Sequence, residues 1–140
     1  MREGANSSER QVRAMRLTER FTTEHAVFLQ QLDLLEKLIR SEAKDDAICA
    51  VAAVVRAPVE KHAREEEELL FPELEPVLGR EEGPLAVLYS DHEQIKCLLE
   101  SIAAATNGQL RKLCESFIRL LRDHIAREDD VVFPFAEQVA

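Results

Sequence analysis

Two pairs of residues in this sequence combine the same two metal-binding side chains at the same spacing. His62 precedes Glu66 by four residues, and His124 precedes Glu128 by four. Residues four apart in a helix lie on one face, one turn apart, so each pair directs an imidazole and a carboxylate the same way. Both groups are ligands of transition metals. The pairs therefore predict a metal site built from two equivalent segments, each of which continues to a Phe-Pro pair.

The other two histidines occur in a second, fainter repeat. An acidic residue precedes each of them, in Glu24-His25 and in Asp91-His92. A single histidine among apolar residues is usually a core residue whose nitrogens bond to other protein groups. Four histidines facing one another without an ion would leave several buried nitrogens unpaired, at about 1–3 kcal/mol each. A bound metal gives these nitrogens a partner, and we expect all four histidines to be ligands.

The elements that must position these residues are helices. Apolar residues recur at steps of three and four, and strand signals are nearly absent, with one Tyr and no Trp in the chain. The periodic segments span approximately residues 18–39, 45–69, 84–102 and 110–131. Their short links predict an all-α fold, an antiparallel up-down-up-down four-helix bundle. We assign residues 17–140 to the bundle and residues 1–16 to a polar N-terminal extension outside it.

The histidines are expected at one depth in this bundle, one on each helix. Each lies seven to ten residues from a helix end on the same side of the bundle. At ~1.5 Å of rise per residue, all four rings lie roughly 10–15 Å from that end. Glu66 and Glu128 follow one turn along the same faces, and a buried carboxylate is tolerated chiefly when it is paired or binds a cation. We therefore expect both glutamates to be metal ligands.

Six ligands from four helices are shared more easily by two ions than by one. Two ions could take two histidines each and share both glutamates, whereas convergence of all six side chains on one point is hard to reach. An oxide or hydroxide bridge would make each ion five-coordinate, with one position open. Nitrogen and oxygen ligands without thiolate suit iron or manganese, while zinc more often takes four ligands in a closed tetrahedron. The expected cofactor is two iron ions with an oxide or hydroxide bridge.

The rest of the composition limits where the protein works and what it binds. A formal net charge of −9, with acidic residues spread along the chain, disfavours nucleic acid and anionic membranes as partners. The three cysteines stand far apart without a CxxC pair, as expected of reduced thiols. The longest apolar run is too short to cross a bilayer, and the polar N-terminus lacks a signal region. We expect a cytoplasmic protein.

These motifs, in this order, resemble the hemerythrin-like, or HHE cation-binding, domains. That family carries His, HxxxE, His and HxxxE on successive helices, with Phe-Pro after each HxxxE, and the match covers residues 18–136. The resemblance implies a left-handed four-helix bundle with a non-haem diiron centre. The ligands that it implies are His25, His62, Glu66, His92, His124 and Glu128. A ferritin-like ExxH site does not fit, because Val59 and Leu121 stand where its glutamates would be.

One departure from the family pattern bears on function. Oxygen-carrying hemerythrins place a fifth histidine one turn after the histidine of the third helix, where this chain has Lys96. The resemblance is therefore to four-histidine members. It implies a protein that binds, senses or reacts with oxygen, nitric oxide or peroxide at an open iron position, rather than a dedicated oxygen carrier. Enzymatic reaction with peroxide or nitric oxide is compatible with such a site.

Two other functions stay open on the sequence. An iron-handling protein that donates iron to other proteins or repairs damaged iron centres would carry the metal as cargo, with a redox or iron-acceptor protein as its partner. A metal-free histidine signalling bundle would leave three of the four histidines unexplained.

Three further residues are candidates to hydrogen-bond to the ligands or to the bound small molecule: Lys96, Tyr89 and Glu65. Each has an ordinary alternative role. Lys96 could extend into water, Tyr89 could pack at the edge of the core, and Glu65 could belong to a solvated acidic face.

Overall fold

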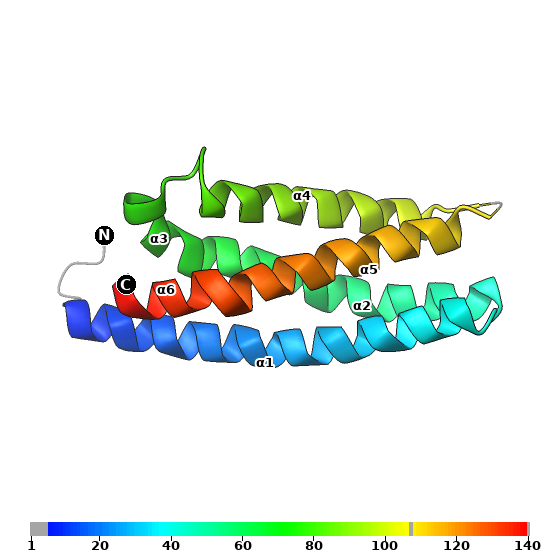
Figure 1. Ribbon diagram of the computed structural model, residues 1–140, viewed down its shortest axis with the longest axis horizontal. Helices are drawn as coiled ribbons and strands as arrows, with labels where there is room; N and C mark the ends of the chain where they lie inside the picture. The colour runs from blue at the N-terminus through cyan, green and yellow to red at the C-terminus, as the bar shows by residue number, and fades with distance from the viewer. Residues whose placement is uncertain (1–5, 107, 140) are drawn as a thin grey trace.

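The computed structural model describes residues 6–106 and 108–139, which form an elongated bundle of helices (Figure 1). Its α-helices are α1 (Ser7–Arg40), α2 (Asp45–Glu65), α3 (Phe71–Leu78), α4 (Pro84–Ala103), α5 (Leu110–Arg127) and α6 (Phe133–Val139). Two short π-helices, η1 (Glu66–Leu70) and η2 (Glu128–Val132), join α2 to α3 and α5 to α6. The described residues contain no strand, so the all-α prediction is confirmed.

The long helices α1, α2, α4 and α5 lie alongside one another over most of the length of the molecule (Figure 1). The links that follow α1 and α4 lie at one end, while α3, α6 and the start of α1 lie at the other. The predicted starts of two helices are confirmed, since α2 begins at Asp45 and α4 at Pro84. Proline suits a first helical position because its missing N–H would have no partner there. Within the described residues, none of the helices is long and apolar enough to span a bilayer.

The first helix begins earlier than the sequence indicates. It starts at Ser7 rather than near Thr18, so the polar segment expected outside the bundle is helical over its described part. Asn6 caps this start, because its side-chain oxygen accepts a hydrogen bond from the backbone N–H of Glu9 at 2.8 Å. Such a cap satisfies one of the backbone donors that a helix start leaves without a partner.

These early turns of α1 are attached to the C-terminal end of the chain. The Gln11 side chain donates a hydrogen bond to the carbonyl of Glu137 at 2.9 Å. The Thr18 hydroxyl donates to the Glu137 carboxylate at 2.8 Å, and Arg13 pairs with Glu73 of α3 at 3.0 Å. Polar contacts of this kind leave little hydrophobic periodicity, which is why the sequence pattern missed this part of the helix.

The two π-helices lie directly before the two Phe-Pro pairs. The N–H of Phe71 bonds to the carbonyl of Glu66, and that of Phe133 bonds to the carbonyl of Glu128, each five residues back. A proline inside an α-helix has no N–H to donate, and its ring collides with the carbonyl four residues back. One wider turn avoids that collision, so the helix continues beyond residues 69 and 131, where the predicted segments end. π-turns of this kind are frequent at functional sites.

The interior consists of two apolar clusters separated by a polar layer. The larger cluster fills the bundle between α1, α2, α4 and α5, and it includes Phe28 and Ile95. The smaller one lies toward α3 and α6 and includes Phe21 and Leu88. His25 falls between Phe21 and Phe28 along α1, just as His92 falls between Leu88 and Ile95 along α4. The buried polar layer is therefore enclosed by apolar side chains above and below.

Candidate metal centre

All six predicted ligands meet in this buried layer. One histidine comes from each of α1, α2, α4 and α5, and the two glutamates are the first residues of η1 and η2. They form two groups, His25, His62, Glu66 and Glu128, and Glu66, His92, His124 and Glu128. In each group the four ligand atoms lie within 4.8 Å of one another, and every member is buried. The two groups hold different histidines and the same two glutamates.

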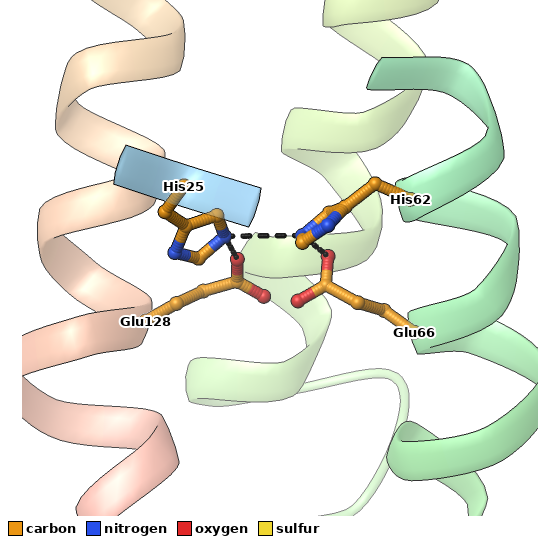
Figure 2. Close-up of side chains that lie close together, drawn as sticks. All are labelled: His25, His62, Glu66 and Glu128. Atoms are coloured by element: carbon orange, nitrogen blue, oxygen red, sulfur yellow. Dashed lines mark hydrogen bonds and ion pairs between the residues drawn. The ribbon is translucent and has the colours of Figure 1, made fainter. Parts of the chain in front are cut away.

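The half of the site shown in Figure 2 is formed by α1, α2, η1 and η2. Nε2 of His25 lies 3.0 Å from Nε2 of His62 and 3.1 Å from Oε1 of Glu128. Nε2 of His62 lies 3.4 Å from Oε1 of Glu66. The two carboxylates reach toward each other from opposite sides of the bundle, beneath the two rings. Two nitrogen and two oxygen donors thus point into one small volume.

The other half repeats this arrangement with α4 and α5. Nε2 of His92 lies 3.2 Å from Oε1 of Glu66, and Nε2 of His124 lies 3.2 Å from Oε1 of Glu128. Glu66 therefore faces one histidine from each half, and so does Glu128. A carboxylate with two oxygens and a donor atom of each half beside it is suited to bridge two cations.

The glutamates carry oxygen atoms that the protein leaves without a hydrogen bond. Within the described part of the chain, these buried atoms are Oε2 of Glu66 and both carboxylate oxygens of Glu128. Oε1 of Glu128 lies near the nitrogens of His25 and His124, but not in the directions that a hydrogen bond requires. A buried carboxylate oxygen without a partner is costly, and a coordinated cation would remove the cost. The donor set fits a metal.

Each histidine is held from behind by a carboxylate. The Nδ1–H of every ring donates to an acidic side chain, which leaves Nε2 as the atom that faces the other ligands. These bonds are His25 to Asp129 at 2.8 Å, His62 to Glu24 at 2.6 Å, His92 to Glu67 at 2.6 Å and His124 to Asp91 at 2.9 Å. Hydrogen bonds of this kind fix the tautomer and orientation of metal-binding histidines.

The acidic neighbours make the rings of His25 and His124 strong bases. Burial alone would lower the pKa of His25, but the hydrogen bond to Asp129 and the nearby charge of Glu128 outweigh burial and raise the pKa to about 9. The pKa of His124 rises to about 10, against burial, through the charge of Glu128 and the hydrogen bond to Asp91. Without a metal, both rings are therefore protonated at neutral pH.

The same balance holds around Glu66. Burial would lower the pKa of His92, but hydrogen bonds to Glu66 and Glu67 raise it to about 9. Burial opposes ionisation of Glu66, but its interactions with Glu128, His62 and His92 hold its pKa well below its usual value. Binding of a cation at these side chains must therefore displace protons from them.

The family model described as the hemerythrin HHE cation binding domain matches residues 16–136. This chain belongs to that family. The match confirms the resemblance recognised from the HxxxE and Phe-Pro motifs. The matched residues include all six predicted ligands.

Relatives of this hemerythrin-like chain include an uncharacterized protein of Mycobacterium tuberculosis (strain H37Rv), which is 30% identical over 132 residues, covering 83% of this chain and 51% of the relative. The iron-sulfur cluster repair protein YtfE of Musicola paradisiaca is 24% identical over 138 residues, 86% of this chain and 62% of the relative. The iron-sulfur cluster repair protein YtfE of Escherichia coli K12 is 32% identical over 88 residues, which cover 54% of this chain and 40% of the relative. The chain spans about half the length of the curated relatives it matches. No solved structure matches it.

The Phe-Pro motif of the hemerythrin-like sequence contributes aromatic walls to the centre. The ring of Phe133 stacks on His25 with centroids 5.5 Å apart, and that of Phe71 stacks on His92 at 5.5 Å. Phe21 and Phe28, which flank His25 along α1, pack edge-on with the His62 ring, with centroids 5.0 and 5.3 Å apart. The rings of Phe21, Phe71 and Phe133 belong to the smaller apolar cluster and cover one end of the ligand layer.

A cavity of about 240 Å³ reaches the ligands from the side. All four histidines line it, together with apolar residues such as Val59 and Leu121, and its exposed lining residues come from α2 and α4. Lys96 is one of them, so the lysine at the position of the fifth histidine lies at the mouth of the cavity rather than among the ligands. The cavity is large enough for a small molecule of a few atoms.

The other two candidates for outer contacts have different partners. The hydroxyl of Tyr89 donates to Glu75 at 3.0 Å, which together with burial raises the pKa of Tyr89 to about 12. Glu65 accepts a hydrogen bond from Arg20 at 2.7 Å. Sequence reasoning missed the four carboxylates that hold Nδ1: Glu24, Glu67, Asp91 and Asp129. The sequence could have indicated them, because in both repeats an acidic residue precedes the single histidine and another follows the HxxxE glutamate.

Proposed function

We propose that this hemerythrin-like domain holds two iron ions and binds, senses or reacts with oxygen, nitric oxide or peroxide there. The observation that carries the proposal is the arrangement of six buried donors in two groups that share both glutamates. In it, His25 and His62 would hold one ion and His92 and His124 the other, with Glu66 and Glu128 shared between them and an oxide or hydroxide as a further ligand. The unpartnered oxygens of the glutamates support this assignment.

The protein's own residues would prepare the site in three ways. The four carboxylates at Nδ1 fix the rings so that every Nε2 faces inward before metal arrives. The aromatic walls limit the access of water. The lateral cavity admits a small ligand next to the histidines. Bound iron would supply a redox-active centre with an open position for that ligand.

Metal analysis of protein purified without air or added metal, together with its optical spectrum, tests this proposal. We expect two irons per chain, a spectrum that shows a bridged ferric pair after oxidation, and a spectral change on addition of nitric oxide or peroxide. Tightly bound zinc as the only metal, or folded protein that takes up no iron, would contradict it.

A second function is favoured by the names of the relatives. Two of them are named iron-sulfur cluster repair proteins, so the iron of this domain could be cargo that is passed to a damaged iron centre in an acceptor protein. Incubation of the iron-loaded protein with a mild chelator or an apo-acceptor separates the two functions. Rapid loss of iron favours delivery, whereas retention with a response to nitric oxide or peroxide favours ligand chemistry.

We also propose that the helices form an antiparallel up-down-up-down left-handed bundle and that the protein is cytoplasmic. The metal-free histidine signalling bundle is not favoured. A phosphate-accepting histidine has to be exposed, and all four histidines of this chain are at most 6% exposed.

A further inference from the structure

The two halves of the centre repeat each other in sequence, and the carboxylates behind the histidines differ most in burial at one pair of equivalent histidines. His62 and His124 are each held by the acidic residue that precedes the histidine of the neighbouring helix, Glu24 and Asp91. The side chain of Asp91 is 8% exposed, whereas that of Glu24 is 34% exposed. The shorter, buried carboxylate has fewer conformations open to it than the longer, half-exposed one.

An arginine holds the buried carboxylate in place. Arg127 donates to Oδ2 of Asp91 at 2.6 Å, and the same oxygen accepts the Nδ1–H bond of His124 at 2.9 Å. Charge-assisted bonds of this length are about twice as strong as neutral ones. The contact also links α5 to α4 directly behind the ligand layer.

The other half lacks an equivalent clamp among the described residues. Glu65 stands at the repeat position of Arg127, three residues after the histidine. Arg20 lies 3.5 Å from Glu24, a longer contact, and makes its short bond, 2.7 Å, to Glu65. His62 therefore depends on a carboxylate that is freer to move.

We propose that Arg127 is a positioning residue for His124 and makes the His92–His124 half the tighter of the two metal positions. The inference rests on the proposed two-ion function. A ligand already fixed in its binding orientation loses less conformational freedom when the metal binds. The ion in the His25–His62 half is then the first to dissociate, so that half supplies the exchangeable iron if the domain delivers metal.

Anaerobic titration of the apo-protein with Fe(II), in competition with a calibrated chelator, tests this inference. The wild type should bind two ions in two resolvable steps. Arg127→Gln should weaken the tighter step by about tenfold or more, the range found when an outer partner of a metal ligand is lost. Arg127→Lys keeps the positive charge but not the planar guanidinium group, and it should lose less Fe(II) affinity at this step than Arg127→Gln.

Arg20→Gln is the matched control, because it also removes a bond between two helices beside a histidine partner. It should leave both steps within a factor of about 3, since an exposed ion pair contributes little. Chemical denaturation of both apo-variants separates a general loss of stability, which either change could cause, from the selective loss of one metal step. If Arg127→Gln does not fold, Arg127→Lys carries the test.

The inference is overturned if Arg127→Gln, or Arg127→Lys in its place, leaves both steps unchanged, or if Arg20→Gln weakens a step as strongly. These outcomes differ from failure of the proposed function, in which the wild type itself does not bind two ions.

Discussion

Every histidine of the centre has a carboxylate at Nδ1, and each carboxylate comes from a different helix than the ring it holds. This crossing ties each ligand to the packing of two helices. Among the described residues, the glutamates lack such support, because Oε2 of Glu66 and both oxygens of Glu128 have no hydrogen bond. At the scale of single residues, the glutamates therefore depend most on a bound cation.

Removal of either glutamate should deplete the centre of metal. We expect Glu66→Ala and Glu128→Ala to lose at least one of the two ions, because each carboxylate belongs to both donor groups. Lys96→Ala should retain both, since Lys96 is exposed at the mouth of the cavity. Iron per chain after identical purification measures the effect. Equal retention by all three variants would count against the bridging roles.

The histidines also predict how the metal-free protein responds to pH. The folded-state pKa values of His25, His92 and His124 are raised to about 9, 9 and 10, above the usual 6.5. Groups of this kind stabilise the fold fully below about pH 6.5 and lose that contribution as pH rises through 9 to 10. A tenfold difference in proton affinity between the folded and unfolded chain corresponds to about 1.4 kcal/mol, so the decline is measurable.

Urea denaturation of the apo-protein between pH 6.5 and 10 checks this expectation, and the free energy of unfolding should fall steadily. The iron-loaded protein is the control, because metal-bound imidazoles carry no titrating proton at Nε2 and its stability should not follow the same curve. A flat apo-protein profile would contradict the assigned ion pairs.

At the scale of elements, the π-turns place the glutamates and the Phe-Pro rings in one layer. Pro72→Ala restores an N–H and removes the ring that excludes the α-helical register. We expect it to weaken iron binding, because a turn that can adopt either register no longer fixes Phe71 against His92. Pro76→Ala, an exposed proline inside α3, is the matched control and should leave iron content unchanged. Equal iron binding by both variants would argue against a role for η1.

The early turns of α1 give a second prediction at this scale. The buried hydroxyl of Thr18 bonds to Glu137, so Thr18→Val should destabilise the protein by about 1 kcal/mol without altering iron content. Thr23→Val is the control, because its exposed hydroxyl donates to the carbonyl of Glu19 in the turn before, within the same helix. Thermal unfolding measures both. A larger loss for Thr23→Val would mean that α1 is not held at Thr18.

At the scale of the whole molecule, the repeated spacing was enough to predict the all-α class and which six side chains gather in one layer. Spacing shows which side chains lie on the same face of one helix, and this is sufficient to place a ligand such as His62 on the inward face. It does not report which neighbour lies across the interface, so Glu65 was chosen as an outer partner where Glu24 makes the contact. Acidic residues next to ligands were visible in the sequence, but pairing them required the packed helices.

The start of α1 and the two π-turns were beyond the sequence pattern for a similar reason. Hydrophobic periodicity detects helices that bury apolar side chains, and the first turns of α1 are held largely by polar contacts to Glu137 and Glu73. The predicted segments 45–69 and 110–131 end just before the Phe-Pro pairs. Whether a helix ends or widens there depends on the packing of Phe71 and Phe133 in the smaller apolar cluster.

The central claim is that two metal ions lie in two halves that share both glutamates. Anomalous diffraction at the iron absorption edge, from crystals of the iron-loaded protein, tests it most directly. We predict two peaks inside the bundle, one beside His25 and His62 and the other beside His92 and His124, with Glu66 and Glu128 in contact with both. A single peak, or peaks outside this layer, would contradict the account.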